Sequence, residues 1–257
     1  LARAHQERRI EKGAVIIERP DITINLEGAG ESITVSLDED PLAPKAHLLV
    51  SELMVLTNAA LAAWAKEHGV TLLHRTQDVA IPKEFSGIWQ TPLEIARVVK
   101  ALAPAVLETN PRPHAGLGEA MYAPSTSPLR RYPDMINETQ IISLLRDGKP
   151  RWSKEELDTL LPLLNAHLDA AGQVQRFRPR YWKLLYFKQQ GDRWWPAVIT
   201  DENDAFVTAN MPKEQMIVRA RRQFFGERTH PGQELEIRLG KVHPLQNDFQ
   251  LLETREI

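Results

Sequence analysis

The hydrophobic pattern of this chain changes period near residue 190, and this change limits the folds that the chain can adopt. Before that point, apolar residues recur mostly at helical spacing, with short β-branched runs between the helices. Beyond it come five short apolar runs separated by turn residues, at 195–199, 205–208, 216–220, 234–239 and 249–252. Such runs are typical of a small closed barrel of the OB type. We therefore expect an α+β chain, with a mixed helix-sheet domain over 1–190 and a small all-β barrel over 191–257.

Within the first domain, the spacing predicts helices over 1–12, 45–68, 91–108 and 153–171. The second helix carries a stripe of apolar residues that we expect to be buried, namely Leu49, Leu53, Leu56, Ala60 and Trp64. Strands with hairpin-like turns are expected over 14–17, 22–26 and 33–37. The run Asp38-Glu39-Asp40 follows the last of these strands, and it favours a solvated turn over a metal site, because metal ligands must converge in space.

Charge and cysteine content exclude several classes of function. A net charge of -2 and a pI near 6.5 give no overall nucleic-acid signature, so any such binding must come from local basic patches. The absence of cysteine excludes disulfides, cysteine-ligated metals and thiol catalysis, and it fits a cytoplasmic enzyme. No stretch approaches the roughly 20 apolar residues of a membrane span, so we expect no membrane association. The chain starts without Met, in what reads as the middle of a helix, and we expect a fragment of a longer protein.

Two adjacent arginines occur in the stretch Thr126-Ser127-Pro128-Leu129-Arg130-Arg131-Tyr132-Pro133-Asp134. Ser127 is a suitable N-cap and Pro128 suits the first helical position, so unpaired amides would point outward beside Arg130 and Arg131. Such a site favours phosphate. The alternative from these residues alone is a pair of surface arginines bonded to carboxylates.

The residues around this stretch carry a longer signature. Read outward, His114-Ala-Gly-Leu-Gly-Glu-Ala-Met-Tyr122, then 126–134, then Met-Ile-Asn at 135–137, resemble the segment of ribonuclease II and ribonuclease R exoribonucleases that contains a Thr-Ser-Pro-Ile-Arg-Arg-Tyr-x-Asp motif. These enzymes are processive 3′→5′ hydrolases of single-stranded RNA. The resemblance implies that Arg130 contacts the scissile phosphate. It also implies RNA binding by the matching residues Tyr122, Ser127, Arg131 and Tyr132.

Two further segments extend the resemblance. Glu52-Leu-Met-Val-Leu-Thr-Asn58 is similar to the Glu-x-Met-x-x-x-Asn pattern that lines the RNA path of the family, which implies that Glu52 and Asn58 bind RNA. From 176 to 187, basic and aromatic residues interleave, and Arg176 is expected to bind RNA. This composition fits RNA binding, with the basic residues on phosphates and the aromatic rings stacked on bases. It equally fits a helix whose aromatic face is packed in the core and whose basic face is exposed to solvent.

Some family residues are replaced or missing. Glu138 and Thr139 stand where relatives have His-Arg, and Gln175 stands where they carry a Glu near the active centre. In the family, Mg²⁺ held by an Asp cluster activates the attacking water. That cluster lies upstream of the start of this chain, so the resemblance implies Mg²⁺ ligands outside it, in a missing N-terminal portion of the same protein. We expect no metal-ligating residues within the chain.

The sequence therefore predicts the C-terminal part of a Mg²⁺-dependent exoribonuclease that degrades single-stranded RNA processively from its 3′ end. The resemblance implies that 1–190 is the C-terminal portion of a ribonuclease II-type catalytic domain and that 191–257 is the OB-fold RNA-binding barrel of the family. We expect a monomeric protein, and we expect this fragment alone to be inactive. The alternative is a non-catalytic module that binds single-stranded RNA, which the replaced residues Glu138, Thr139 and Gln175 favour. A third hypothesis is a phosphate-binding structural scaffold.

Overall fold

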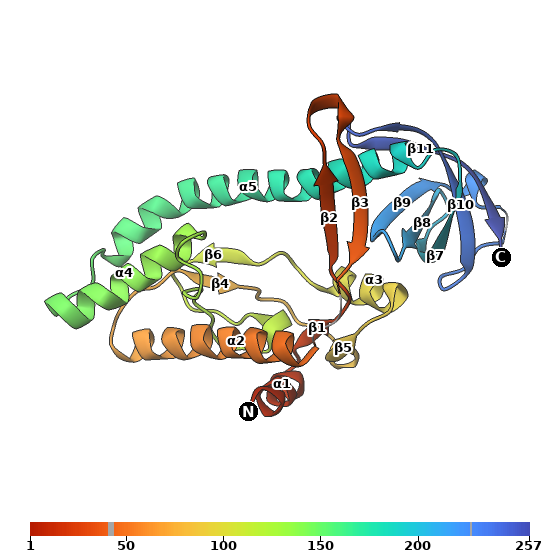
Figure 1. Cartoon of the computed structure of the whole chain (residues 1–257). Coiled ribbons are helices and arrows are strands. Elements are labelled where there is room, and N and C mark those ends of the chain that lie inside the picture. Colours follow the sequence, from red (N-terminus) through yellow and green to blue (C-terminus); the bar gives the residue numbers. More distant parts are fainter. Residues whose placement is uncertain (41–43, 227) are drawn as a thin grey trace. The chain divides into compact units, whose positions relative to one another are not determined.

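The structure, a computed structural model, describes residues 1–40, 44–226 and 228–257 (Figure 1). The chain divides into two compact units, and each is assembled from segments that are distant in sequence. The first unit contains Leu1–Ile17, Ala43–Trp89 and Val98–Asp169, and the second contains Glu18–Leu42, Gln90–Arg97 and Ala170–Ile257. The predicted domain boundary between residues 190 and 191 stays a prediction.

The first unit is mainly helical. Its helices are α1 (Ala2–Glu11), α2 (Pro44–Glu67), α4 (Tyr132–Asp147) and the first part of α5 (Lys154–Gln189). Two short sheets lie between them: β1 (Val15–Ile17) pairs in parallel with β5 (Gly87–Trp89), and β4 (His74–Thr76) pairs antiparallel with β6 (Val106–Glu108). One apolar core cluster is built on Ala62 and Leu72, and a second on Leu73, Ile136 and Leu157. The predicted helices over 1–12 and 45–68 are confirmed.

The buried face of α2 differs from the predicted apolar stripe. Leu49, Leu53 and Leu56 are exposed, and the buried positions are Glu52, Val55, Asn58, Ala62 and Ala65. Two polar residues therefore occupy the inner face, and their partners are described below. By length and composition alone, Lys45–Glu67 is long and apolar enough to cross a membrane, so the prediction that no stretch approaches this length was wrong. Ala62 and Ala65 of this helix pack in an apolar core cluster of the first unit.

Two other helices have different ends from those predicted. Helix α3 (Pro92–Ala101) stops well before residue 108, because Pro104 has no amide to continue a helix and the chain then enters β6. Helix α5 does not stop near residue 171. It continues through Gly172 and Pro179 to Gln189, and its last turns bury Leu184 and Phe187 in the core of the second unit. This apolar burial offsets the backbone hydrogen bond that Pro179 cannot make.

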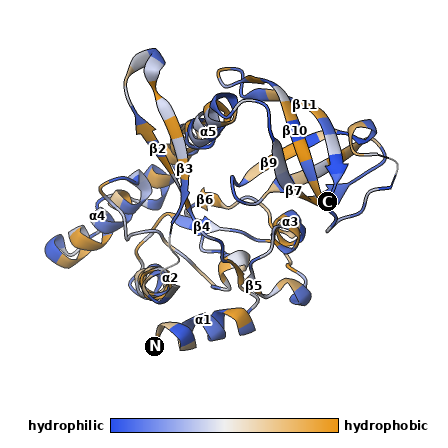
Figure 2. Cartoon of the chain, turned by 45° about the vertical axis from the view of Figure 1, so that its right-hand side comes forward, coloured by the Kyte–Doolittle hydropathy of each residue, from blue (hydrophilic) through white to orange (hydrophobic). Residues whose placement is uncertain are grey.

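A five-stranded antiparallel sheet forms the centre of the second unit. Its strands are β7 (Trp194–Glu202), β8 (Phe206–Met211), β9 (Met216–Arg221), β10 (Glu234–His243) and β11 (Asp248–Glu256), in the order β11-β10-β7-β8-β9. Buried residues alternate with more exposed ones along β8 and β9. Hydrophobic and hydrophilic residues both occur along the strands of this sheet (Figure 2). All five predicted strands and the predicted fold class are confirmed. The sheet is a curled half-barrel, because in the described part of the chain its edge strands β9 and β11 do not pair to close it.

A hairpin of β2 (Ile22–Glu27) and β3 (Thr34–Glu39) also belongs to the second unit. Gln189 of α5 fastens it, since its side-chain amide donates to the carbonyl of Ile33 at 2.6 Å and accepts from the amide of Val35 at 2.9 Å. The predicted strands over 22–26 and 33–37 are confirmed.

Candidate functional site

The arginine pair lies in a turn, and the helix begins later than predicted. The amides of Arg130 and Arg131 donate to the carbonyl of Ser127 at 3.2 and 3.0 Å, and α4 begins only at Tyr132. Its N-cap is Arg131, so the prediction that Ser127 caps the helix and Pro128 begins it was wrong. Pro133 occupies the first turn instead, where a missing amide costs the helix little.

Asp134 fixes the shape of this turn. Its carboxylate is almost fully buried, and Oδ1 accepts from the amide of Ser127 at 2.9 Å. The same oxygen accepts from the guanidinium of Arg131, at 3.1 Å from Nε and 2.6 Å from Nη2. Charge-assisted bonds of this kind are the strong ones in proteins. Arg131 is thereby committed to an internal ion pair.

The side chain of Arg130 differs from that of Arg131 in its exposure and in its partners. Its side chain is exposed, and it takes part in no hydrogen bond or ion pair among the residues that the structure describes. Leu129 and Tyr132 on either side are also exposed. Within the described residues, the turn therefore exposes an unpaired guanidinium together with an aliphatic side chain and an aromatic ring, which are groups that can pair with a phosphate and contact a base.

A hydrogen-bond network built on Asn58 supports the turn. Asn58 is fully buried on α2, and its Nδ2 donates to the hydroxyl of Tyr122 at 2.8 Å and to Oγ1 of Thr126 at 3.3 Å. Its Oδ1 accepts from the amide of Ser125 at 2.8 Å. Thr126 Oγ1 in turn accepts from Arg131 at 3.4 Å. The structure thus brings together four of the predicted site residues, Asn58, Tyr122, Ser127 and Arg131.

The carboxylate of Glu52 bonds to two basic side chains of α1, Arg9 and His5. Its Oε1 accepts from Nη1 of Arg9 at 2.5 Å, and its Oε2 lies 2.7 Å from Nδ1 of His5. Arg9 also donates from Nε to the carbonyl of Leu117 at 2.8 Å. The side chains of Arg9 and Glu52 are both almost fully buried. The arrangement ties α1 to α2, and an RNA contact by Glu52 stays a prediction.

The glycines of the 114–122 segment serve close packing within the protein. Gly118 has a φ of 66°, and a Cβ on it would lie 2.5 Å from the carbonyl oxygen of Arg9. A Cβ on Gly116 would lie 2.6 Å from Oε1 of Gln77. Burial lowers the pKa of the neighbouring His114 to about 4, with the charges of Arg75 and Arg9 acting in the same direction. His114 is therefore neutral near pH 7, as expected of a structural histidine.

Two amide residues of α4 that were not predicted as site residues position this region, although Asn137 lies in the segment that carries the resemblance. Asn137 is fully buried and bonds to both the amide and the carbonyl of Leu73, at 2.7 and 2.9 Å. Gln140 makes the corresponding pair of bonds to Trp152, at 2.8 and 2.9 Å. Glu138 and Thr139, which replace the His-Arg of relatives, lie between them and are half-buried. The signal in the sequence was two amides three residues apart on a helix.

A metal centre does not fit the described residues, which contain no group of three or more His, Asp or Glu side chains able to hold an ion. The acidic run at 38–40 is used within the β2–β3 hairpin. Asp38 accepts from Asn25 at 2.6 Å and Asp40 accepts from Thr23 at 2.8 Å, whereas Glu39 makes no such bond in the described part.

The basic and aromatic stretch at 176–187 of α5 contains both residues packed in the core and residues exposed to solvent, so each of the two interpretations applies to a part of it. Tyr186 and Phe187 pack against Trp195 in the core of the second unit. Phe177 is exposed and stacks on Tyr181 with ring centroids 6.4 Å apart. Arg176 is exposed on the part of α5 that belongs to the second unit. Among the described residues of this stretch, those of the first turn, 176–179, are therefore exposed and include basic side chains, as RNA binding requires.

Comparison with known proteins supplies the family. An RNB domain family model matches residues 1–147. An uncharacterized ribonuclease of Synechocystis is 25% identical over 262 residues, which cover 98% of this chain and 38% of the relative. Among solved structures, the Dss1 exoribonuclease of Candida glabrata (an active-site mutant) has a TM-score of 0.79 at 22% identity, over 97% of this chain and 34% of its own. Mycoplasma genitalium RNase R in complex with ribose-methylated single-stranded RNA has a TM-score of 0.71 at 16% identity, over 98% of this chain and 48% of its own.

The chain spans only 21 to 38% of the length of the first curated relatives that it matches. The likeness to the solved structures shows the fold, and the family match covers more than half of the chain. The resemblance read from the sequence is thereby confirmed. The chain belongs to the RNB domain family, whose relatives here are ribonucleases and exoribonucleases.

Proposed function

We propose that this chain is the RNA-holding part of a 3′→5′ exoribonuclease that degrades single-stranded RNA processively, with Arg130 contacting the scissile phosphate. The family match and the exoribonuclease relatives support ribonuclease activity. The solved complex of RNase R with single-stranded RNA supports RNA as the ligand. We also propose a monomeric, cytoplasmic protein.

The observation that carries the proposal is the unequal state of the two arginines. Asp134 holds Arg131, and Arg131 in turn helps to fix the turn that projects Arg130 into solvent, where its side chain has no partner among the described residues. A guanidinium held in this way can donate two parallel hydrogen bonds to a phosphate without first breaking an ion pair. The backbone bonds to Ser127 limit the directions that it can point. Positioning of this kind is the main contribution that a protein makes to phosphoryl chemistry.

We propose that the activating Mg²⁺ is held by another part of the full-length protein, because the described residues offer no ligand set for it. When bound there, Mg²⁺ would supply the activated water of the hydrolysis. This chain would bind the RNA backbone and orient one phosphate. Alone, it should bind RNA and leave its length unchanged.

The test is Arg130→Lys in the full-length protein, with Arg146→Lys as the matched control. Arg146 is an exposed arginine on α4 whose ion pair in the described part of the chain is with its neighbour Asp147. Lysine keeps the charge and loses the bidentate geometry. We expect Arg130→Lys to lower kcat by about 100-fold, with the Kd for RNA changed less than about threefold. An equal loss in kcat and affinity would contradict a role in the transition state. The control should match the wild type.

The lack of a metal ligand set in the described residues also keeps a second function open, a non-catalytic module that binds single-stranded RNA. A 5′-labelled RNA ladder, incubated with Mg²⁺ and the full-length protein, separates the two. Stepwise shortening supports the exoribonuclease, and intact RNA that is nevertheless bound supports the module.

A further inference from the structure

The parallel sheet of β1 and β5 in the first unit has only two strands and little cover. Parallel sheets occur almost only where both faces pack against other elements, and two strands alone are marginally stable at best in water. Five of the six residues in this sheet are aliphatic or aromatic, yet none of the six is buried. The sheet of β4 and β6 differs, since His74, Thr76 and Leu107 in it are buried. The first sheet therefore lacks the cover that its composition and strand direction require.

The register shows which backbone groups of this sheet are used. The amide of Gly87 donates to the carbonyl of Ala14 at 3.0 Å, and Ile16 lies opposite Ile88. In a parallel pair, alternate residues direct their amide and carbonyl to the partner strand, and the residues between them direct theirs away. Gly87 and Trp89 of β5 therefore bond toward β1, and Ile88 directs its amide and carbonyl outward. Among the described residues, no hydrogen bond joins either group of Ile88 to another segment.

The two edges of the sheet differ in what lies beside them. β1 lies next to the short helix Ala115–Leu117, and a Cβ on the following Gly118 would lie 3.1 Å from the amide nitrogen of Ala14. The backbone beside β1 thus comes from the chain itself. On the side of β5, the side chain of Ile88 is exposed. The free edge of the sheet is therefore that of β5.

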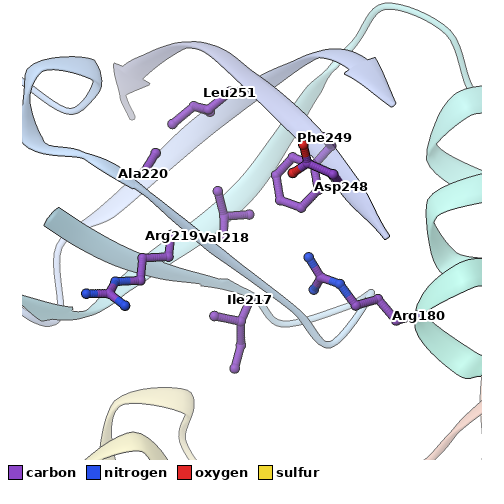
Figure 3. A pocket seen from close by; sticks show the side chains of 8 residues that line it. All are labelled: Arg180, Ile217, Val218, Arg219, Ala220, Asp248, Phe249 and Leu251. Atoms are coloured by element: carbon purple, nitrogen blue, oxygen red, sulfur yellow. The ribbon is translucent and has the colours of Figure 1, made fainter. Parts of the chain in front are cut away.

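The five-stranded sheet of the second unit shows how this chain covers an edge elsewhere. The opening between β9 and β11 is lined by Arg180 of α5 and by Phe249, with the guanidinium 5.6 Å from the ring centre (Figure 3). Farther along β11, Oγ1 of Thr254 donates to the carbonyl of Phe224 at 2.7 Å. An apolar edge strand without such cover is a site for pairing with another strand.

The first unit has a second uncovered apolar surface, on α2. Four large aliphatic residues of this helix are exposed, namely Leu49, Val50, Leu53 and Leu56. From Ala46 to Ala65 the helix carries one charged residue, Glu52, and that residue is buried. Exposed apolar surface of this kind marks an interface with another protein segment or a membrane. A lipid bilayer could cover α2, but it offers no backbone groups to Ile88, so a protein segment accounts for both surfaces.

We propose that a β-strand from the missing N-terminal portion of the same protein adds to β5, with its backbone bonded to the amide and the carbonyl of Ile88. The proposal rests on the proposed function for the existence of that portion, and the chain spans only 21 to 38% of the length of its first curated relatives. Strand addition of this kind gains its affinity from main-chain hydrogen bonds. A free peptide could also add a strand, but it would leave the aliphatic face of α2 uncovered.

The first test is hydrogen exchange of single amides in the full-length protein and in the 257-residue chain. It is read by mass spectrometry with electron-transfer fragmentation of the peptide 83–92. We expect the Ile88 amide to exchange about 100-fold more slowly in the full-length protein. The amide of Gly87 is the reference in the same strand, because its bond to Ala14 lies within the chain. In the 257-residue chain the Ile88 amide should exchange much faster than that of Gly87, and in the full-length protein both should be slow.

The second test removes the amide. Proline is tolerated in an edge strand where the amide that it lacks faces away from the partner. Ile88→Pro should therefore leave the melting temperature of the 257-residue chain unchanged, and it should lower that of the full-length protein by about 2 °C. Ile88→Val is the matched control, since it keeps both the amide and a β-branched side chain, and it should change neither protein.

Two results would overturn the proposal. One is an equal exchange rate of the Ile88 amide in the two proteins. The other is protection in the 257-residue chain that rises with its concentration, because a second copy of the chain would then be the partner. Neither measurement needs RNA or cleavage, so both are independent of the Arg130 test. An inactive full-length protein with a protected Ile88 amide would refute the proposed function and support the added strand.

Discussion

Glu52→Gln should destabilise the first unit strongly. The exposed fractions of the Glu52 and Arg9 side chains are only 4% and 5%, so water screens their ion pair little. Breaking a buried pair by removing one charge costs about 3–5 kcal/mol. The glutamine oxygen can keep one hydrogen bond, which places the expected cost near the lower end, at about 3 kcal/mol. With a urea m-value of about 2–3 kcal/mol/M, the unfolding midpoint should fall by about 1–1.5 M.

Hydrogen exchange in α1 and α2 during urea unfolding measures this effect in the unit that contains the pair. A double mutant, Arg9→Met with Glu52→Leu, should recover most of the lost stability, because it removes both charges together. Asp147→Asn is the control, since the pair of Arg146 and Asp147 is solvent-exposed and should leave the midpoint unchanged. A midpoint for Glu52→Gln within about 0.3 M of the wild type, a margin of about 0.6–0.9 kcal/mol at that m-value, would refute the buried ion pair. It would also return Glu52 to the residues free to contact RNA.

Three further outcomes are expected. Asp134→Asn should lower the free energy of unfolding, measured by urea titration, by about 2 kcal/mol. This is less than for a fully buried pair, because the Arg131 side chain is about one-third exposed. An unchanged midpoint would contradict the role assigned to Asp134. Gly118→Ala should lower the melting temperature by more than Gly148→Ala does. Both glycines have a positive φ, but of the two only Gly118 has an atom within 4 Å of the added Cβ. Equal changes in melting temperature would argue against the close packing at Gly118. Burial lowers the pKa of His74 from 6.5 to about 4, and the charge of Glu108 opposes this shift. Between these two values the unfolded state binds more protons than the folded state, so the free energy of unfolding should fall as the pH decreases from 6.5 to about 4. His74→Gln should flatten that decrease in a series of urea titrations.

Elements governed by local periodicity were predictable from the sequence. The five strands of the half-barrel and the helices α1 and α2 follow the alternation and helical spacing of their apolar residues. The end of α5 was missed because Gly172 and Pro179 are local signals to stop, and the burial of Leu184 and Phe187 outweighs them. Tertiary burial is not visible in a single sequence.

The candidate site was predictable as a set of residue types, but its connections were not. The resemblance assigned the scissile phosphate to Arg130 and RNA binding to Arg131, and only the structure shows that Asp134 holds Arg131. The buried face of α2 was predicted from its leucines, whereas the structure buries Glu52 and Asn58. A polar residue can be buried only if a partner arrives from elsewhere in the chain, and that partner, such as Arg9, is 43 residues away from Glu52.

The side chains of Asn137 and Gln140 form hydrogen bonds with the backbone amides and carbonyls of Leu73 and Trp152, as a neighbouring strand would. These bonds restrict which substitutions the protein can accept at the two positions. An aliphatic residue on α4 can be exchanged for another of similar volume at small cost. A hydrophobic residue at either amide position would leave three backbone groups without their hydrogen-bond partner, at about 1–3 kcal/mol for each buried group. A shift of α4 by one residue would break all six bonds that these two amides make. Positions 137 and 140 should therefore tolerate few single substitutions in a saturation mutagenesis library, although neither is placed to touch RNA.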